Sequence, residues 1–146
     1  MHALPPGYFL LSIGVMIVLH LAVPLVRCVP TPWNAIGAVP LLGGIVMAVI
    51  ANRIFARRET VIHPFAEPSA LVVEGPFRYT RNPMYLGLIL ALVGFALLLG
   101  TLTPWLVIVP FGLILDRKFV RHEQRTMEER FGDDYRAYRQ RVRRWI

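Results

Sequence analysis

A polar and aromatic segment, GPFRYTRNPMYLG at residues 75–87, stands between a charged stretch and a long apolar run. Polar groups are costly where a chain enters a membrane, so this segment suggests a binding role. Asn is favoured as a helix N-cap and Pro at the first helical position, so a helix is predicted to begin at Asn82-Pro83. The free amides and positive dipole end of such a helix attract anions, and Arg78 and Arg81 add positive charge beside them.

Glu123 is a second candidate, on the helix predicted to leave the last apolar run. With His122, Met127 and Phe131, this helix could bring polar and apolar atoms back over the helix start at Asn82. Its carboxylate could hold the cationic end of a ligand.

A plainer interpretation stays open for both segments. In it, Asn82-Pro83 only caps a helix, the arginines contact lipid phosphate, and the tyrosines form an interfacial belt. The Glu123 carboxylate would then be one half of an ion pair. The chemistry of these residues alone does not choose between the two interpretations.

The composition is typical of an integral membrane protein. Of the 146 residues, 55% are hydrophobic and only 17% are charged, whereas soluble domains average about 45–50% and about 25%. The net charge of +7 could suggest nucleic acid, but the basic clusters flank apolar runs, so anionic lipid headgroups explain them better and no nucleic-acid partner is predicted. The single Cys28 excludes an intrachain disulfide and a CxxC motif, and no metal is predicted.

Four uncharged stretches predict four membrane spans. Residues 8–26 and 33–51 are uncharged runs of 19 residues, each rising about 28 Å as a helix, close to the thickness of a bilayer core. Residues 82–115 are too long for one span, so residues 100–104 are predicted to form a hairpin turn, and the return helix must continue through Asp116, Arg117 and Lys118. The predicted spans of this single membrane domain, residues 1–146, are about 8–27, 33–52, 83–99 and 104–120.

The basic residues predict the orientation. The loop at 53–82 carries five arginines, the tail at 121–146 and the end of the last span carry ten Lys and Arg, and Arg27 is the remaining one of 16. The positive-inside rule then places both termini in the cytoplasm, which means the inner membrane in a bacterium. The N-terminus lacks the basic region of a cleaved signal peptide, so the first apolar run is interpreted as a retained helix.

The tail shows an amphipathic pattern. Gly132 is a plausible helix break, and Phe131, Tyr135, Tyr138 and Val142 recur at spacings of three to four. We interpret this face as part of an interfacial helix that lies on anionic lipid.

Two motifs together give a resemblance to a known family. The pattern "LV..GPF.YTRNPMYLG", followed by "E.......FG..Y..Y...V", resembles the isoprenylcysteine carboxyl methyltransferase and phospholipid methyltransferase superfamily. Its members are small, all-α, polytopic membrane enzymes that use S-adenosylmethionine. The similar region runs from about residue 60 to 146, roughly 60% of the chain.

The resemblance implies an S-adenosylmethionine pocket and a hydrophobic or lipid-like acceptor drawn from the membrane. The helix start and its arginines would suit the carboxylate of the cofactor, Glu123 its amine or ribose, and aromatic faces the sulfonium. Methyl transfer needs no covalent enzyme intermediate, so no catalytic residue is assigned. The implied cofactor contacts are Ser69, Ala70, Leu71, Val72, Phe77, Arg81, Asn82, Pro83, Met84, Tyr85 and Glu123.

The chain departs from the family pattern at three positions. Asn82 replaces a His, Gln124 replaces a second Glu, and Phe119 stands where an Arg would meet a substrate carboxylate. Arg117 and Arg121 are nearby and become the candidates on the substrate side. A prenylcysteine carboxylate is therefore not the expected acceptor.

Two other functions stay open. Membrane sterol reductases share a related C-terminal motif and use NADPH, although a chain of 146 residues is small for a dinucleotide and a sterol. Alternatively, the chain could be a non-catalytic membrane module with the same fold.

Overall fold

The computed structural model describes residues 4–57 and 70–146. These residues are mostly helical, with one isolated pairing between Arg27 and Thr101 and no strand among them. The predicted all-α class is confirmed. η1 and η2 are 3-10 helices and η3 is π-helical. The elements in chain order are α1 (Pro5–Ala22), η1 (Trp33–Gly37), α2 (Ala38–Arg57), η2 (Gly75–Arg78), α3 (Pro83–Leu99), α4 (Trp105–Ile114), η3 (Leu115–Val120) and α5 (Arg121–Arg141).

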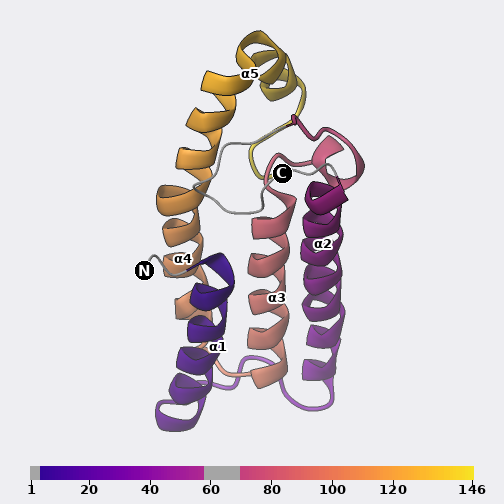
Figure 1. Cartoon of the computed structure of the whole chain (residues 1–146). Coiled ribbons are helices and arrows are strands. Elements are labelled where there is room, and N and C mark those ends of the chain that lie inside the picture. Colours follow the sequence, from indigo (N-terminus) through magenta and orange to yellow (C-terminus); the bar gives the residue numbers. More distant parts are fainter. Residues whose placement is uncertain (1–3, 58–69) are drawn as a thin grey trace.

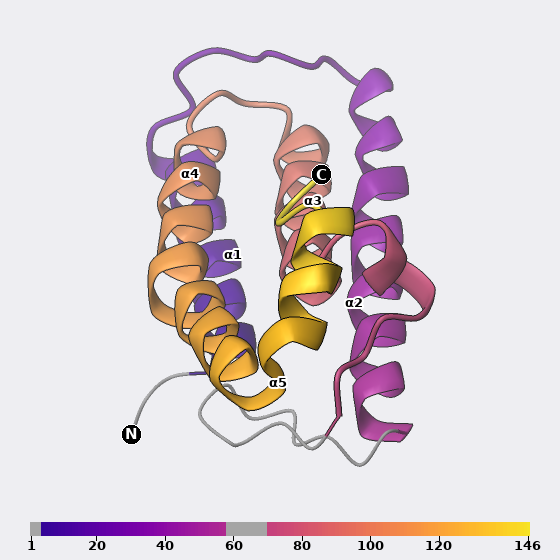
Figure 2. The same ribbon diagram turned by 90° about the horizontal axis from the view of Figure 1, so that it is seen from above.

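The helices α1 to α4 run side by side as a bundle, and α3 lies between α2 and the pair formed by α1 and α4 (Figures 1 and 2). α5 continues α4 beyond the bundle, and its second half turns back over the beginning of α3 (Figure 2). The start of α1, the end of α2, the start of α3 and α5 therefore share one end of the molecule (Figure 1).

Apolar side chains cover the outside of this bundle. Leu10, Leu21 and Val39 are 66%, 73% and 70% exposed. α1 and the continuous unit Trp33–Arg57 are long and apolar enough to cross a membrane. Only 17% of the apolar 18-residue window of each is buried, unlike a core helix of a soluble protein. α3 is apolar but has 17 residues. Two helices of the described residues are thus long enough to span a membrane, and the presence of four membrane spans stays a prediction.

Two helix ends differ from the sequence predictions. α1 ends at Ala22 rather than near residue 27, because Val23 precedes Pro24 and takes a non-helical conformation. Pro24 therefore lies outside the helix and does not kink α1. α2 extends to Arg57, beyond the predicted limit at residue 52.

α2 and α3 pack closely because glycines face each other across their interface. A Cβ atom on Gly44 would collide with the backbone of Gly87 and Ala91, and one on Gly94 would collide with the backbone of Leu41 and Gly37. This close approach fixes the lateral position of α3 and therefore of the segment that precedes it.

The predicted hairpin turn at residues 100–104 is confirmed. Gly100 ends α3 with φ 74° and α4 begins at Trp105. Thr103 donates a hydrogen bond to the Leu19 carbonyl (3.2 Å), and Thr101 bonds the His20 ring (2.8 Å), which ties the turn to α1. The helix also continues through Asp116, Arg117 and Lys118 as predicted, in the π-helical η3.

α5 breaks at Gly132, as predicted, where φ is 47° and ψ is −116°. The interpretation of the following aromatic face is wrong, however. Tyr135, Tyr138 and Val142 are buried within the protein and pack against Leu71 and Met127 rather than lying on lipid. The reason is that the turn at Gly132 folds this half of α5 back onto the molecule.

Candidate functional site

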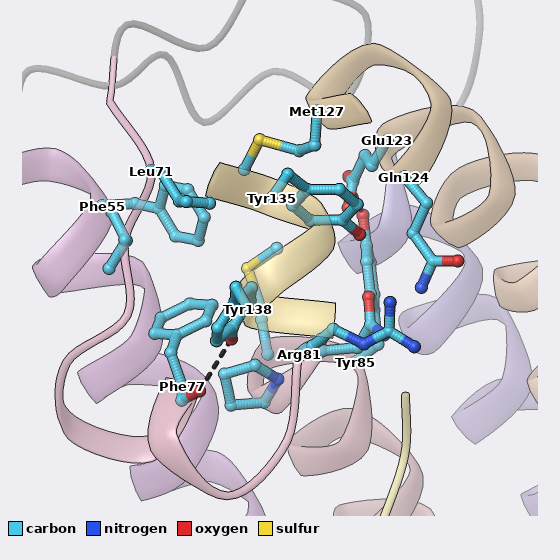
Figure 3. Close-up of a pocket in the computed structure, with 14 residues that line it drawn as sticks. Phe55, Leu71, Phe77, Arg81, Tyr85, Glu123, Gln124, Met127, Tyr135 and Tyr138 are labelled. Atoms are coloured by element: carbon cyan, nitrogen blue, oxygen red, sulfur yellow. Dashed lines mark hydrogen bonds between the residues drawn. The ribbon is translucent and has the colours of Figure 1, made fainter. Parts of the chain in front are cut away.

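A cavity of about 60 Å³ lies where the ends of α2, α3 and α5 meet (Figure 3). Its wall is largely aromatic and apolar, and its polar groups are few. The lining residues are Phe55, Leu71, Val72, Phe77, Arg81, Asn82, Pro83, Met84, Tyr85, Glu123, Gln124, Met127, Tyr135 and Tyr138.

The structure brings most of the sequence-predicted residues together. Those that line the cavity are Leu71, Val72, Phe77, Arg81, Asn82, Pro83, Met84, Tyr85 and Glu123. Ser69 lies outside the described residues, and Ala70 is described but does not line the cavity. Arg117 and Arg121 are exposed and also lie outside the lining, and Arg121 forms an ion pair with Asp116 (3.0 Å).

Sequence reasoning did not assign five lining residues: Phe55, Gln124, Met127, Tyr135 and Tyr138. The expected placement of Met127 over the start of α3 is correct, and the two tyrosines were visible as an amphipathic face. Phe55, at the end of α2, had no local pattern that could have marked it.

Glu123 and Tyr85 form the polar centre of the cavity. The Tyr85 hydroxyl donates a hydrogen bond to Oε1 of Glu123. Part of the Glu123 side chain stays accessible, but its carboxyl group is desolvated, and this burial raises its pKa to about 7 although the bond from Tyr85 lowers it. The group can therefore change charge near neutral pH.

Arg81 and Gln124 present hydrogen-bond donors without acceptors. Nε and Nη1 of Arg81 and Nε2 of Gln124 are buried and have no partner in the described part of the chain. Burial raises the pKa of the neighbouring Tyr135, and the charge and hydrogen bond of Arg81 partly offset this effect. Because buried donors without partners are costly, three of them in one cavity indicate a place for an anionic or acceptor-rich group.

Asn82 occupies the predicted N-cap position, and Pro83 the first helical position. Its side chain makes no capping hydrogen bond, which corrects the expected role. Nδ2 instead donates to the Arg144 carbonyl oxygen at 2.8 Å. The Arg144 carbonyl oxygen comes from a segment 62 residues later in the chain, so local pattern reasoning had no access to it.

The remaining wall is a set of packed aromatic rings. The rings of Phe55 and Phe77 meet edge to face, with their centroids 5.0 Å apart. The Tyr138 hydroxyl donates a hydrogen bond to the Phe77 carbonyl oxygen at 2.7 Å (Figure 3). Burial, with the nearby Tyr135, raises the pKa of Tyr138 to about 12, so Tyr138 remains neutral. These contacts join α2, η2 and α5 into one apolar surface.

A comparison with known families now bears on this geometry. The family described as phospholipid methyltransferase matches residues 33–134, well over half of the chain. The chain belongs to the phospholipid methyltransferase family. The matched range includes every lining residue except Tyr135 and Tyr138.

This phospholipid methyltransferase family member also resembles an uncharacterized protein of Haemophilus influenzae, with 41% identity over 63 residues. That match covers 43% of this chain and 100% of the relative. No solved structure matches the chain. Family membership, with the apolar helices, makes the chain a membrane-associated methyltransferase.

Proposed function

We propose that this methyltransferase takes its methyl group from S-adenosylmethionine and transfers it to a hydrophobic or lipid-like acceptor. The observation that carries the proposal is the charge pattern of the cavity. Buried donors at Arg81 and Gln124, which have no partner within residues 4–57 and 70–146, line the same small space as Glu123.

The amino-acid end of S-adenosylmethionine carries one carboxylate and one ammonium group. Arg81 and Gln124 can donate to the carboxylate, and an Arg–carboxylate pair is among the stronger hydrogen-bonded contacts. Glu123 can accept from the ammonium group. The cavity therefore matches a zwitterion, with a site for each charge.

The apolar wall suits the rest of the cofactor. Aromatic rings at Phe55, Phe77 and Tyr138 offer faces and edges to a purine or a sulfonium. Met84 and Met127 have flexible side chains that can adapt to a ligand. Such adaptation is required, because the cavity of about 60 Å³ is smaller than typical ligand pockets of about 300–1,000 Å³.

The chain contributes chiefly alignment. When bound, S-adenosylmethionine would supply an activated methyl group, so the residues of the cavity would bind it, orient it and exclude water. Rings packed on one side and the Tyr85–Glu123 pair on the other would hold the two ends of the ligand in a fixed direction.

We further propose that the acceptor enters sideways from the bilayer and that both termini are cytoplasmic. The lining residues come mainly from the end of α2, the segment leading into α3, and α5, which share one end of the bundle (Figure 1), and the outer faces of the bundle helices are apolar. The arginines of α5 would then face anionic headgroups.

Calorimetry in detergent tests the cofactor. S-adenosylhomocysteine and 5′-methylthioadenosine share an adenosine and a thioether, but the second lacks the amino-acid end. Arg81→Met and Glu123→Gln should each weaken S-adenosylhomocysteine about tenfold or more, as expected for hydrogen bonds to charged groups, and should leave methylthioadenosine little changed.

Arg139→Met is the matched control, because Arg139 is 56% exposed and pairs with Glu128 outside the cavity. NADPH is titrated against the same samples. Binding of NADPH without S-adenosylhomocysteine would replace the proposal with a reductase, and binding of neither nucleoside by the wild-type protein would refute it.

A further inference from the structure

Residues 142–146 lie across the segment that leads into α3. The backbone N–H of Arg81 donates to the Arg143 carbonyl oxygen at 3.0 Å. The Arg144 carbonyl oxygen accepts from Nδ2 of Asn82 at 2.8 Å and from Oγ1 of Thr80 at 3.3 Å. Three consecutive residues, 80 to 82, are thus hydrogen-bonded to the backbone of residues 143 and 144.

The same segment is anchored on its other side. Nη2 of Arg144 pairs with Oδ1 of Asp116 at 3.1 Å, and these side chains are only 32% and 17% exposed. Removing one partner of an ion pair that is shielded from water in this way costs more stability than removing one partner of a surface pair. Trp145 packs against the apolar cluster that contains Tyr85 and Phe119.

Asp116 belongs to η3, which leads directly into the part of α5 that carries Glu123. The segment therefore connects the two walls of the cavity, because it bonds the residues around Arg81 on one side and η3 on the other. Asn82 lines the cavity and donates one hydrogen bond from Nδ2 to this segment.

We propose that residues 142–146 form a positioning strap, anchored by the Arg144–Asp116 ion pair, that aims the Arg81 side chain at the anionic end of the cofactor. The proposal rests on the proposed function. Two buried nitrogens of the Arg81 side chain have no acceptor among the described residues, so where they point depends on the position of the Arg81 backbone together with the hydrogen bond between Arg81 and Tyr135. Asn82, Arg144 and Asp116 are accordingly positioning residues.

The test compares the two nucleosides in variants of the anchor. Arg144→Met removes the charge and keeps most of the apolar stem, whereas Arg144→Lys keeps the charge. We expect Arg144→Met and Asn82→Ala to weaken S-adenosylhomocysteine about tenfold, the loss typical of a misplaced charged contact. Methylthioadenosine, which lacks the group that Arg81 would bind, should change less than about twofold, and Arg144→Lys should recover much of the affinity.

Two other outcomes would contradict the strap. Equal weakening of both nucleosides would mean a general loss of the cavity, and unchanged affinity in Arg144→Met would mean that the segment does not position Arg81. If Arg144→Met does not fold, Asp116→Asn removes the same ion pair, and Arg121→Met, which removes only the other ion pair of Asp116, is its control. Arg139→Met serves as control for loss of one arginine. Failure of the proposed function gives a different result, because the wild-type protein would then bind neither nucleoside. That result would also contradict the strap.

Discussion

The Glu123 carboxyl group and the Tyr85 hydroxyl share a hydrogen bond inside the cavity, so protonation of this carboxyl decides whether the site can receive a cation. Its pKa of about 7 results from two opposing effects, burial raising it and the Tyr85 bond lowering it. Below that pH the group is mostly neutral, and above it the group carries the charge that an ammonium ligand needs.

We therefore predict that affinity for S-adenosylhomocysteine rises with pH and levels off above about pH 7. Below that value it should fall by up to about tenfold per pH unit, because binding must release a proton from Glu123. Calorimetry in two buffers with different ionisation enthalpies measures this proton directly. Glu123→Gln should bind weakly at every pH, and a pH-independent affinity of the wild-type protein would contradict the assignment.

Tyr85→Phe gives a sharper prediction at the same place. Because the bond from Tyr85 lowers the pKa of Glu123, its removal should raise that pKa. The midpoint of the affinity profile should then move to higher pH while the profile keeps its shape. A midpoint that stays in place would show that the hydroxyl does not contact the carboxyl group in solution.

At the scale of elements, the α2–α3 contact places the start of α3 and so the cavity. Gly44 and Gly43 are adjacent on α2 and make a matched pair. A Cβ on Gly44 meets the α3 backbone at Gly87 and Ala91, whereas Gly43 has open space around it.

Gly44→Ala should lower the free energy of unfolding by about 1–3 kcal/mol through overpacking. Gly43→Ala should be neutral or stabilising by up to about 1 kcal/mol through better helix propensity. Thermal unfolding of both variants in the same detergent decides the matter. Equal stability of the two would mean that α2 and α3 do not approach each other in this way.

Gly132 is a second glycine on which the arrangement of the helices depends, because α5 reverses its direction there. Its φ of 47° is in the left-handed region, where a side chain costs about 1–2 kcal/mol. Gly132→Ala should therefore destabilise the reversal of α5 that covers the cavity with Tyr135 and Tyr138. Both nucleosides should bind more weakly, in contrast to the selective loss expected for Arg144→Met, and unaltered binding of both would contradict this role.

The sequence predicted these elements better than it predicted their contacts. The hairpin at Gly100, the break at Gly132 and the helix start at Pro83 follow from local residue chemistry. The Asn82 partner and the place of Phe55 depend on segments remote in the chain, which local patterns do not encode. The Tyr135–Tyr138 face was visible as a periodicity, but periodicity does not say whether protein or lipid covers it.

At the scale of the whole molecule, α5 and the start of α3, which line the cavity, lie at one end of the bundle and the 100–104 turn at the other (Figure 1). Cys28 is exposed and lies near that far turn, since its backbone N–H donates to the Gly100 carbonyl oxygen at 2.8 Å. The distribution of arginines predicts that the cavity end faces the cytoplasm. The native cysteine is therefore predicted to lie on the opposite side of the membrane.

A membrane-impermeant maleimide should label Cys28 in intact spheroplasts of a bacterial expression host. In a Cys28→Ser background, Arg139→Cys, on the exposed side of α5, should react only after the cells are lysed. The two sites lie at opposite ends of one bundle, so opposite labelling also requires that the bundle crosses the bilayer. Labelling of Arg139→Cys alone in intact cells would reverse the orientation, and labelling of both would contradict a membrane-spanning arrangement.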